Sequence, residues 1–100
     1  MPQIHLKQPG LPVADFAVYG AVVTVAGVAI DCAARQQDGA VVLEIRSNET
    51  GPGEGGDGAY LAQIAIPARR FDESETDDGV QRRPQPLDPN AVAITLWPAA

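Results

Sequence analysis

The sequence predicts a small all-β fold, an antiparallel β-sandwich or barrel of six to seven short strands. Residues 22–46 are mostly apolar and rich in β-branched side chains, which favour a pleated sheet over a helix. Short runs elsewhere alternate apolar with polar residues, which is the period of a half-buried strand. Because one open sheet would leave an apolar face in water, the strands are expected to close into two layers or a barrel.

The length of 100 residues predicts a single domain that spans residues 1–100. Cys32 is the single cysteine, so the chain has no intrachain disulfide and gives no sign of an oxidising compartment. No apolar run reaches the roughly 18 residues of a membrane span, and residues 1–10 lack the apolar segment of a signal peptide. These features predict a cytoplasmic location when the protein is synthesised and no membrane partner.

The first two strands are predicted at residues 3–7 and within residues 11–19. Residues 3–7, QIHLK, alternate apolar and polar side chains over a short run, which is typical of a half-buried edge strand. Residues 11–19 also allow a short helix that begins at Pro12, because proline suits the first helical position. The spacing of Phe16 and Val18 favours extended structure.

Residues 22–46 are predicted to form a three-stranded meander, with its first turn at Ala26-Gly27 and its second at residues 37–39. The second turn has an alternative, because Asp31 can cap a short helix over residues 32–37. The hairpin is favoured, since the Gln-Asp-Gly sequence of residues 37–39 lies between two β-like runs.

Two more strands are predicted at residues 59–66 and 91–97. In the first, the period of two places Tyr60 on the same face as the apolar Ile64. In the second, Trp97 lies on the face opposite the aliphatic side chains, so either both faces are covered or the indole is exposed. A core position is favoured for Trp97, and an exposed Trp97 would be an interface anchor.

Two long loops, residues 47–58 and 71–90, separate the later strands and are expected to be mobile. The first, SNETGPGEGGDG, contains five glycines and one proline, and the second is acidic and then proline-rich. Such stretches bury too little apolar surface to offset the entropy lost on ordering.

The charge of the chain points to protein partners. With 13 acidic and 7 basic residues the net charge is −6, which argues against nucleic acid as a direct partner. Unpaired strand edges at residues 3–7 or 91–97 can extend the sheet of another chain. The predicted partner is therefore another protein or a second copy of this chain.

Three residues are the candidate interface residues. Arg69 and Arg70 lie immediately before the acidic run at residues 72–78, and Trp97 is the candidate aromatic anchor.

No arrangement of catalytic or metal-binding residues is recognisable. His5 and Cys32 are single residues, too few for a zinc site, and no local base accompanies the Cys32 thiol. Asp31 and Glu44 are acids that an enzyme would use as an acid–base pair, and nothing in the sequence places them together. We therefore expect a non-enzymatic protein with no cofactor and no metal.

The alternative function is a small ion- or ligand-binding module that uses the acidic loops. Glu49, Glu54 and Asp57 place carboxylates on a glycine-rich backbone, and such oxygens bind Ca²⁺. Their spacing does not match an EF-hand. A solvated acidic loop is favoured over a calcium site.

Three short phrases resemble small proteins encoded in the virion- and tail-assembly regions of bacteriophages and prophages. They are VAGVAID at residues 25–31, IAIPARR at residues 64–70 and LWP at residues 96–98. The resemblance implies a non-enzymatic β-domain that docks onto copies of itself or onto other virion proteins, and hence a virion-associated location. It transfers no site residue, because the phrases contain no functional motif.

Overall fold

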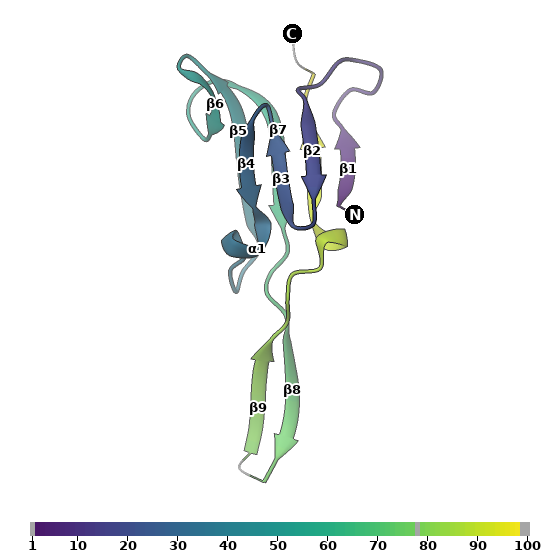
Figure 1. The fold of residues 1–100 in the computed structure, drawn as a ribbon, viewed down its shortest axis with the longest axis vertical. Coiled ribbons are helices and arrows are strands. Elements are labelled where there is room, and N and C mark those ends of the chain that lie inside the picture. Colours follow the sequence, from purple (N-terminus) through teal and green to yellow (C-terminus); the bar gives the residue numbers. More distant parts are fainter. Residues whose placement is uncertain (1, 78, 99–100) are drawn as a thin grey trace.

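The computed structural model describes residues 2–77 and 79–98 and confirms a small all-β fold (Figure 1). The described elements are β1 (Gln3–Leu6), β2 (Phe16–Tyr19), β3 (Val22–Val25), β4 (Val28–Asp31), α1 (Cys32–Arg35), β5 (Val41–Asn48), β6 (Gly51–Glu54), β7 (Ala59–Ile66), β8 (Phe71–Thr76), β9 (Gly79–Pro84), the 3₁₀ turn η1 (Pro89–Ala91) and β10 (Ala93–Leu96). Among them, no helix has the length and apolarity needed to cross a membrane.

The strands form two sheets and a separate hairpin (Figure 1). The larger sheet has the order β1-β10-β7-β5-β6, and the smaller sheet has the order β2-β3-β4. The hairpin consists of β8 and β9. Every pairing between these strands is antiparallel except that of β1 with β10, which is parallel. Both sheets stay open, so the described chain is a sandwich and not a closed barrel.

The core lies between the two sheets and follows from the alternation of the strands. Every second side chain of β3 and β10 points inward and is buried, as are Leu43 and Ile45 of β5. The large side chains that are less than 2% exposed are Ile45, Ile64, Ile66, Ile94, Leu96, Val23, Val25, Val92 and Cys32. In residues 91–97, the face that carries the aliphatic side chains points inward, as the period of two predicted.

The two segments expected to be loops contain strands. β6 lies within residues 47–58 and pairs with β5, and β8 and β9 lie within residues 71–90 and pair with each other. The described chain therefore has ten strands, more than the six to seven expected. Neither segment offers an alternating apolar face, which is why the period of two did not identify it.

The segment of residues 31–39 forms the short helix α1, and the hairpin favoured for it is wrong. The Asp31 carboxylate caps α1, because its Oδ1 accepts from the amides of Ala33 at 3.1 Å and Ala34 at 3.3 Å. The helix leads the chain from the smaller sheet to the larger one, so β4 and β5 do not pair. The first turn of the meander is as expected, with positive φ at Ala26 (50°) and Gly27 (83°).

The edges of the larger sheet also differ from expectation. β1 is an edge strand, as predicted, whereas β10 lies between β1 and β7. The expectation of a free edge at residues 91–97 is wrong, because β1 covers that edge by parallel pairing.

The face of Tyr60 was predicted incorrectly. A bulge shifts the register between β5 and β7, so that Ile45 pairs with Ala62 whereas Arg46 pairs with Tyr60. Leu61 is the extra residue and is buried. Tyr60 therefore lies on the outer face of the larger sheet, away from Ile64.

The hairpin of β8 and β9 projects beyond the sandwich as an arm, residues 71–84 (Figure 1). The molecule measures 60 × 27 × 19 Å. Its radius of gyration is 16.3 Å, against about 13 Å for a compact domain of this length. All side chains of β9 are exposed. The arm thus lies outside the core.

Candidate interaction surface

Four side chains form a row across the outer face of the larger sheet, which we call the aromatic ladder. Arg46 of β5 lies over the Tyr60 ring, with 4.1 Å between Cζ and the ring centroid. The rings of Tyr60 and Trp97 are stacked, with centroids 5.0 Å apart and an interplanar angle of 22°. Nζ of Lys7 lies 5.6 Å from the centroid of the Trp97 ring. These distances are in the range of cation–π and aromatic contacts.

The backbone brings the four side chains together from neighbouring positions in the sheet, since Arg46 lies in β5, Tyr60 lies in β7, and Lys7 and Trp97 immediately follow β1 and β10. Tyr60 pairs with Arg46 because of the bulge at Leu61. The Trp97 amide donates to the Leu61 carbonyl at 3.0 Å, which places Trp97 beside Tyr60. The Lys7 amide donates to the Leu96 carbonyl at 2.9 Å, which places Lys7 beside Trp97.

The Arg46 end of the aromatic ladder is neutralised within the chain. Nε and Nη2 of Arg46 donate to Oε2 of Glu44 at 3.1 and 3.0 Å. Nη2 also donates to the Tyr60 hydroxyl at 2.8 Å, and that hydroxyl donates to Oε1 of Glu44 at 3.3 Å. The guanidinium is therefore held in place by its neighbours.

The Lys7 end of the aromatic ladder is open. Lys7 is exposed on the edge side of the sheet, and no ion pair joins it to another residue in 2–77 or 79–98. The cation is therefore available to a carboxylate of another molecule, with the Trp97 ring beside it.

The arm has a register set by charge. Asp72 lies opposite Arg83, and Glu73 lies opposite Arg82. Nε of Arg82 is 3.4 Å from Oε1 of Glu73, and the guanidinium carbon is 4.6 Å from the centroid of the Phe71 ring. Opposite charges that face each other across two strands stabilise that register. The acidic run and the arginines that follow it are thus the two strands of one hairpin.

The arm joins the sandwich through Arg69. The Arg69 amide donates to the Gln37 carbonyl at 2.9 Å, and its Nη2 donates to the Gln36 carbonyl at 2.8 Å. Its Nη1 lies 3.4 Å from Oδ1 of Asp38. On the returning strand, the Gln85 amide donates to the Arg70 carbonyl at 2.8 Å. These bonds fix the base of the arm to the segment that follows α1.

The three candidate interface residues lie at two ends of the sandwich. Trp97 lies beside the start of β7, whereas Arg69 and Arg70 follow the end of β7. Trp97 is half-buried against Tyr60, Arg69 is half-buried in the contacts at the base of the arm, and Arg70 is exposed. The structure therefore does not bring the three into one surface.

Sequence reasoning missed the other members of the aromatic ladder. Lys7, Arg46 and Tyr60 come from strands whose order in the sheet cannot be read from local patterns. The bulge that turns Tyr60 outward has no signature in the residues around it. Outward cations at Lys7 and Arg46 are visible in the alternation, but their alignment with Trp97 is not.

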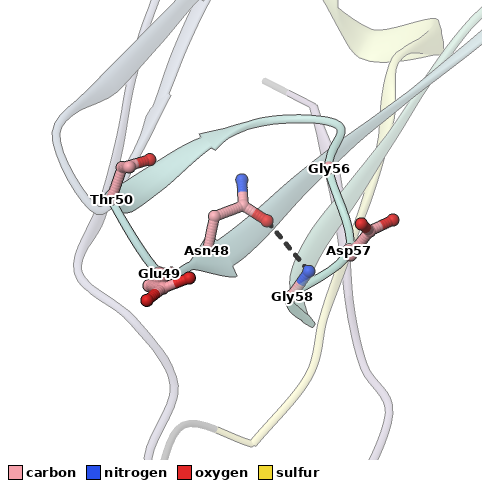
Figure 2. A pocket seen from close by; sticks show the side chains of 6 residues that line it. All are labelled: Asn48, Glu49, Thr50, Gly56, Asp57 and Gly58. Atoms are coloured by element: carbon pink, nitrogen blue, oxygen red, sulfur yellow. Dashed lines mark hydrogen bonds between the residues drawn. The ribbon is translucent and has the colours of Figure 1, made fainter.

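The glycine-rich loop is closed by Asn48 (Figure 2). Nδ2 of Asn48 donates to the Gly55 carbonyl at 2.9 Å, and its Oδ1 accepts from the Gly58 amide at 2.9 Å. A Cβ at Gly58 would overlap the Ser47 carbonyl oxygen. The loop thus has a defined conformation around the Asn48 amide.

The acidic residues of this loop do not converge. The loop borders a cavity of about 470 Å³, but Figure 2 shows the carboxylates of Glu49 and Asp57 on opposite sides of Asn48. Glu54 is paired with Arg35, whose Nη1 donates to its Oε2 at 3.0 Å and whose Nη2 donates to its Oε1. Within the described ranges, no group of three His, Cys, Asp or Glu side chains is placed to hold a metal ion.

The Arg35–Glu54 pair shifts the ionisation of both groups. Hydrogen bonding from the Arg35 guanidinium lowers the pKa of Glu54 below its usual 4.5. The same hydrogen bonds, with the charge of Glu54, raise the pKa of Arg35. The pair joins α1 to β6 and so closes the β4–β6 side of the sandwich.

The residues considered for catalysis are separated. Asp31 caps α1 on the smaller sheet, and Glu44 binds Arg46 on the outer face of the larger sheet. Cys32 is buried, and burial, with a smaller effect of the Asp31 charge, raises the pKa of its thiol. His5 is exposed on β1.

Comparison of the chain with protein-family models, with curated proteins and with solved structures finds no match.

Proposed function

We propose that this chain is a non-enzymatic structural protein that binds other protein subunits through its projecting arm, as a component of a bacteriophage or prophage virion or of its assembly. The observation that carries the proposal is the arm itself, an ordered hairpin outside the core. In this proposal the protein is made in the cytoplasm and acts as part of a larger particle.

The arm buries almost nothing within its own chain. Its second strand is exposed along its whole length, and Val80 is 61% exposed. A two-stranded hairpin is at best marginally stable in water without further packing. A partner surface is what would supply that packing.

The arm is also held in a defined position. Its cross-strand charges fix the register, and the Arg69 contacts fix its base. A binding element that is already ordered loses less entropy on association than a disordered one. The arm is therefore suited to reach from one subunit into the next.

The assignment to a virion component rests on the resemblance of residues 25–31, 64–70 and 96–98. The middle phrase covers the end of β7 and the base of the arm, including Arg69 and Arg70. A β-sandwich with an extended arm is consistent with a protein that docks onto neighbours.

The test is to remove the arm and keep the sandwich. Phe71 and Pro84 lie opposite each other, so residues 72–83 can be replaced by Asn-Gly, which closes a two-residue hairpin turn. The full-length and armless chains are each co-expressed with the neighbouring genes. The complexes are purified, and their molar mass is measured by light scattering. Near-ultraviolet circular dichroism from Trp97 confirms that the sandwich folds in both.

The expected result is that the full-length chain forms a complex with a neighbouring gene product or with itself, and that the armless chain does not. Neighbouring genes for capsid or tail proteins are expected. A full-length chain that stays a free monomer, or a complex that does not need the arm, would overturn the proposal.

A further inference from the structure

We infer that the arm of one copy docks on the aromatic ladder of a second copy, head to tail. The inference rests on the proposed function and names its partner as this same chain. It is carried by four features, namely the positions of the two surfaces, their chemistry, their charge and their dimensions.

The arm and the aromatic ladder lie at opposite ends of the sandwich. Tyr60 and Trp97 lie at the start of β7, and the arm follows the end of β7 and points away from the sandwich (Figure 1). The arm cannot fold back onto the ladder of its own chain, because its base is fixed by Arg69. It can reach a ladder only on a second copy.

The chemistry of the two surfaces is complementary. Near the tip of the arm, Glu75 lies directly opposite Val80, so a carboxylate and an aliphatic side chain are neighbours. At the open end of the ladder, Lys7 lies beside the Trp97 ring, so an ammonium group and an apolar surface are neighbours. Docking would pair Glu75 with Lys7 and Val80 with Trp97.

Charge favours the same contact. Residues 71–84 carry five acidic and two basic residues, a net charge of 2 − 5 = −3. The outer face of the larger sheet carries the cations Lys7 and Arg46 against the single carboxylate Glu44. On a chain of net charge −6, this face is the one with a positive balance among the described outer faces of the sheets. Opposite potentials raise the rate of association and fix its orientation.

The dimensions also agree. Each strand of the arm has six residues, which is about 20 Å at 3.3 Å per residue. β7 has eight residues, or about 26 Å, so the outer face is long enough to receive the arm. At the end of this face away from the ladder lie the small side chains of Ala65 and Ala93, which pair with each other and leave room for a hairpin.

The contact is heterologous, because it joins two different surfaces. Each copy then has one free arm and one free ladder, and the assembly grows into a ring or a filament. A two-fold dimer would instead join identical surfaces and stop at two copies.

The experiment uses charge reversal with rescue on the full-length chain. Lys7→Glu reverses the charge at the open end of the ladder, and Glu75→Lys reverses a charge near the tip of the arm. Both side chains are exposed. Ala17→Glu, on an exposed side chain of β2 in the smaller sheet, is the control for an added negative charge. Association of each protein, and of the mixed reversals, is measured by sedimentation velocity across concentration and salt.

The wild-type and Ala17→Glu proteins are expected to form oligomers that weaken as salt rises. Each reversal alone is expected to raise the dissociation constant by about tenfold or more. Mixing the two reversed proteins is expected to restore growth into an assembly in which they alternate, because every ladder–arm contact between unlike copies pairs opposite charges while contacts between like copies repel.

Two results would overturn this inference and leave the proposed function in place. One is a wild-type chain that stays monomeric while its arm binds a neighbouring gene product. The other is self-association that the two reversals do not weaken or that their mixture does not restore. Loss of every arm-dependent complex would overturn both.

Discussion

The indole of Trp97 is stacked on the phenol ring of Tyr60, with 5.0 Å between the ring centroids, on the outer face of the larger sheet. The stack exists because Leu61 forms a bulge that turns Tyr60 outward. The hydroxyl of Tyr60 also joins Arg46 to Glu44, so this one side chain connects the aromatic and the charged parts of the surface.

Changes at Tyr60 are expected to separate these two contributions. Tyr60→Phe keeps the stack and removes the hydroxyl, so the free energy of unfolding should fall by about 1 kcal/mol. Tyr60→Ala removes the stack as well and should lower it by about 2 kcal/mol, with a red shift in Trp97 emission. Urea titration followed by fluorescence measures both. Equal losses for the two variants would show that the ring stack contributes nothing.

Gly58→Ala is expected to destabilise the protein, because the new Cβ would overlap the Ser47 carbonyl oxygen. A backbone clash of this kind should lower the free energy of unfolding by about 2 kcal/mol or more. Gly39→Ala is the matched control, since a Cβ at Gly39 meets nothing within 4 Å. Thermal or urea unfolding of the two variants makes the comparison. Similar stabilities would mean that the loop around Asn48 adapts freely.

Acid is expected to remove the contribution of the Arg35–Glu54 pair. The folded-state pKa of Glu54 lies below its usual 4.5, so the folded state binds this proton less readily than the unfolded state. The stability from the pair is therefore present above about pH 4.5 and is lost as pH falls through the lowered pKa. Urea unfolding of wild type and Glu54→Gln from pH 3 to pH 7 tests this. The two stabilities should converge in acid, and a constant difference would contradict the assignment.

Reversal of one charge in the arm is expected to melt the arm without unfolding the sandwich. Arg82→Glu places two carboxylates opposite each other, and Glu73 and Arg82 are both more than 60% exposed, so the cost is under about 1 kcal/mol. Such a cost still shifts the population of a marginally stable hairpin several-fold. Amide exchange measured by NMR should rise in the arm and stay low for β5 and β7. The double variant Glu73→Arg/Arg82→Glu should restore protection, unless the pair does not set the register.

The sandwich could be predicted from sequence because its strands bury one face each. Alternation identified the inward side chains of β3, β5 and β10, and the apolar content of residues 22–46 identified the centre of the fold. The helix α1 was weighed and not chosen, because its cap at Asp31 and the turn at residues 37–39 are both strong local signals. Tertiary packing, which places β4 and β5 in different sheets, decided between them.

Neither the arm nor the aromatic ladder could be predicted from the sequence, and the reason differs between them. The arm buries no face, so hydrophobic periodicity does not identify its strands. The sequence does contain the acidic residues and the later Arg82 and Arg83 that pair across the hairpin. The ladder depends on the order of β1, β10, β7 and β5 and on a bulge. Neither property is local in sequence.

The parallel pairing of β1 with β10 has a consequence for synthesis on the ribosome. β1 is translated before β10 and has no partner in the sheet until β10 follows. Contacts between the two ends of a chain are the slowest to form, and an unpaired strand is exposed to aggregation meanwhile. The arm lies between β7 and β10 in the sequence, so it is translated before β10 can join β7 to β1 and complete the larger sheet.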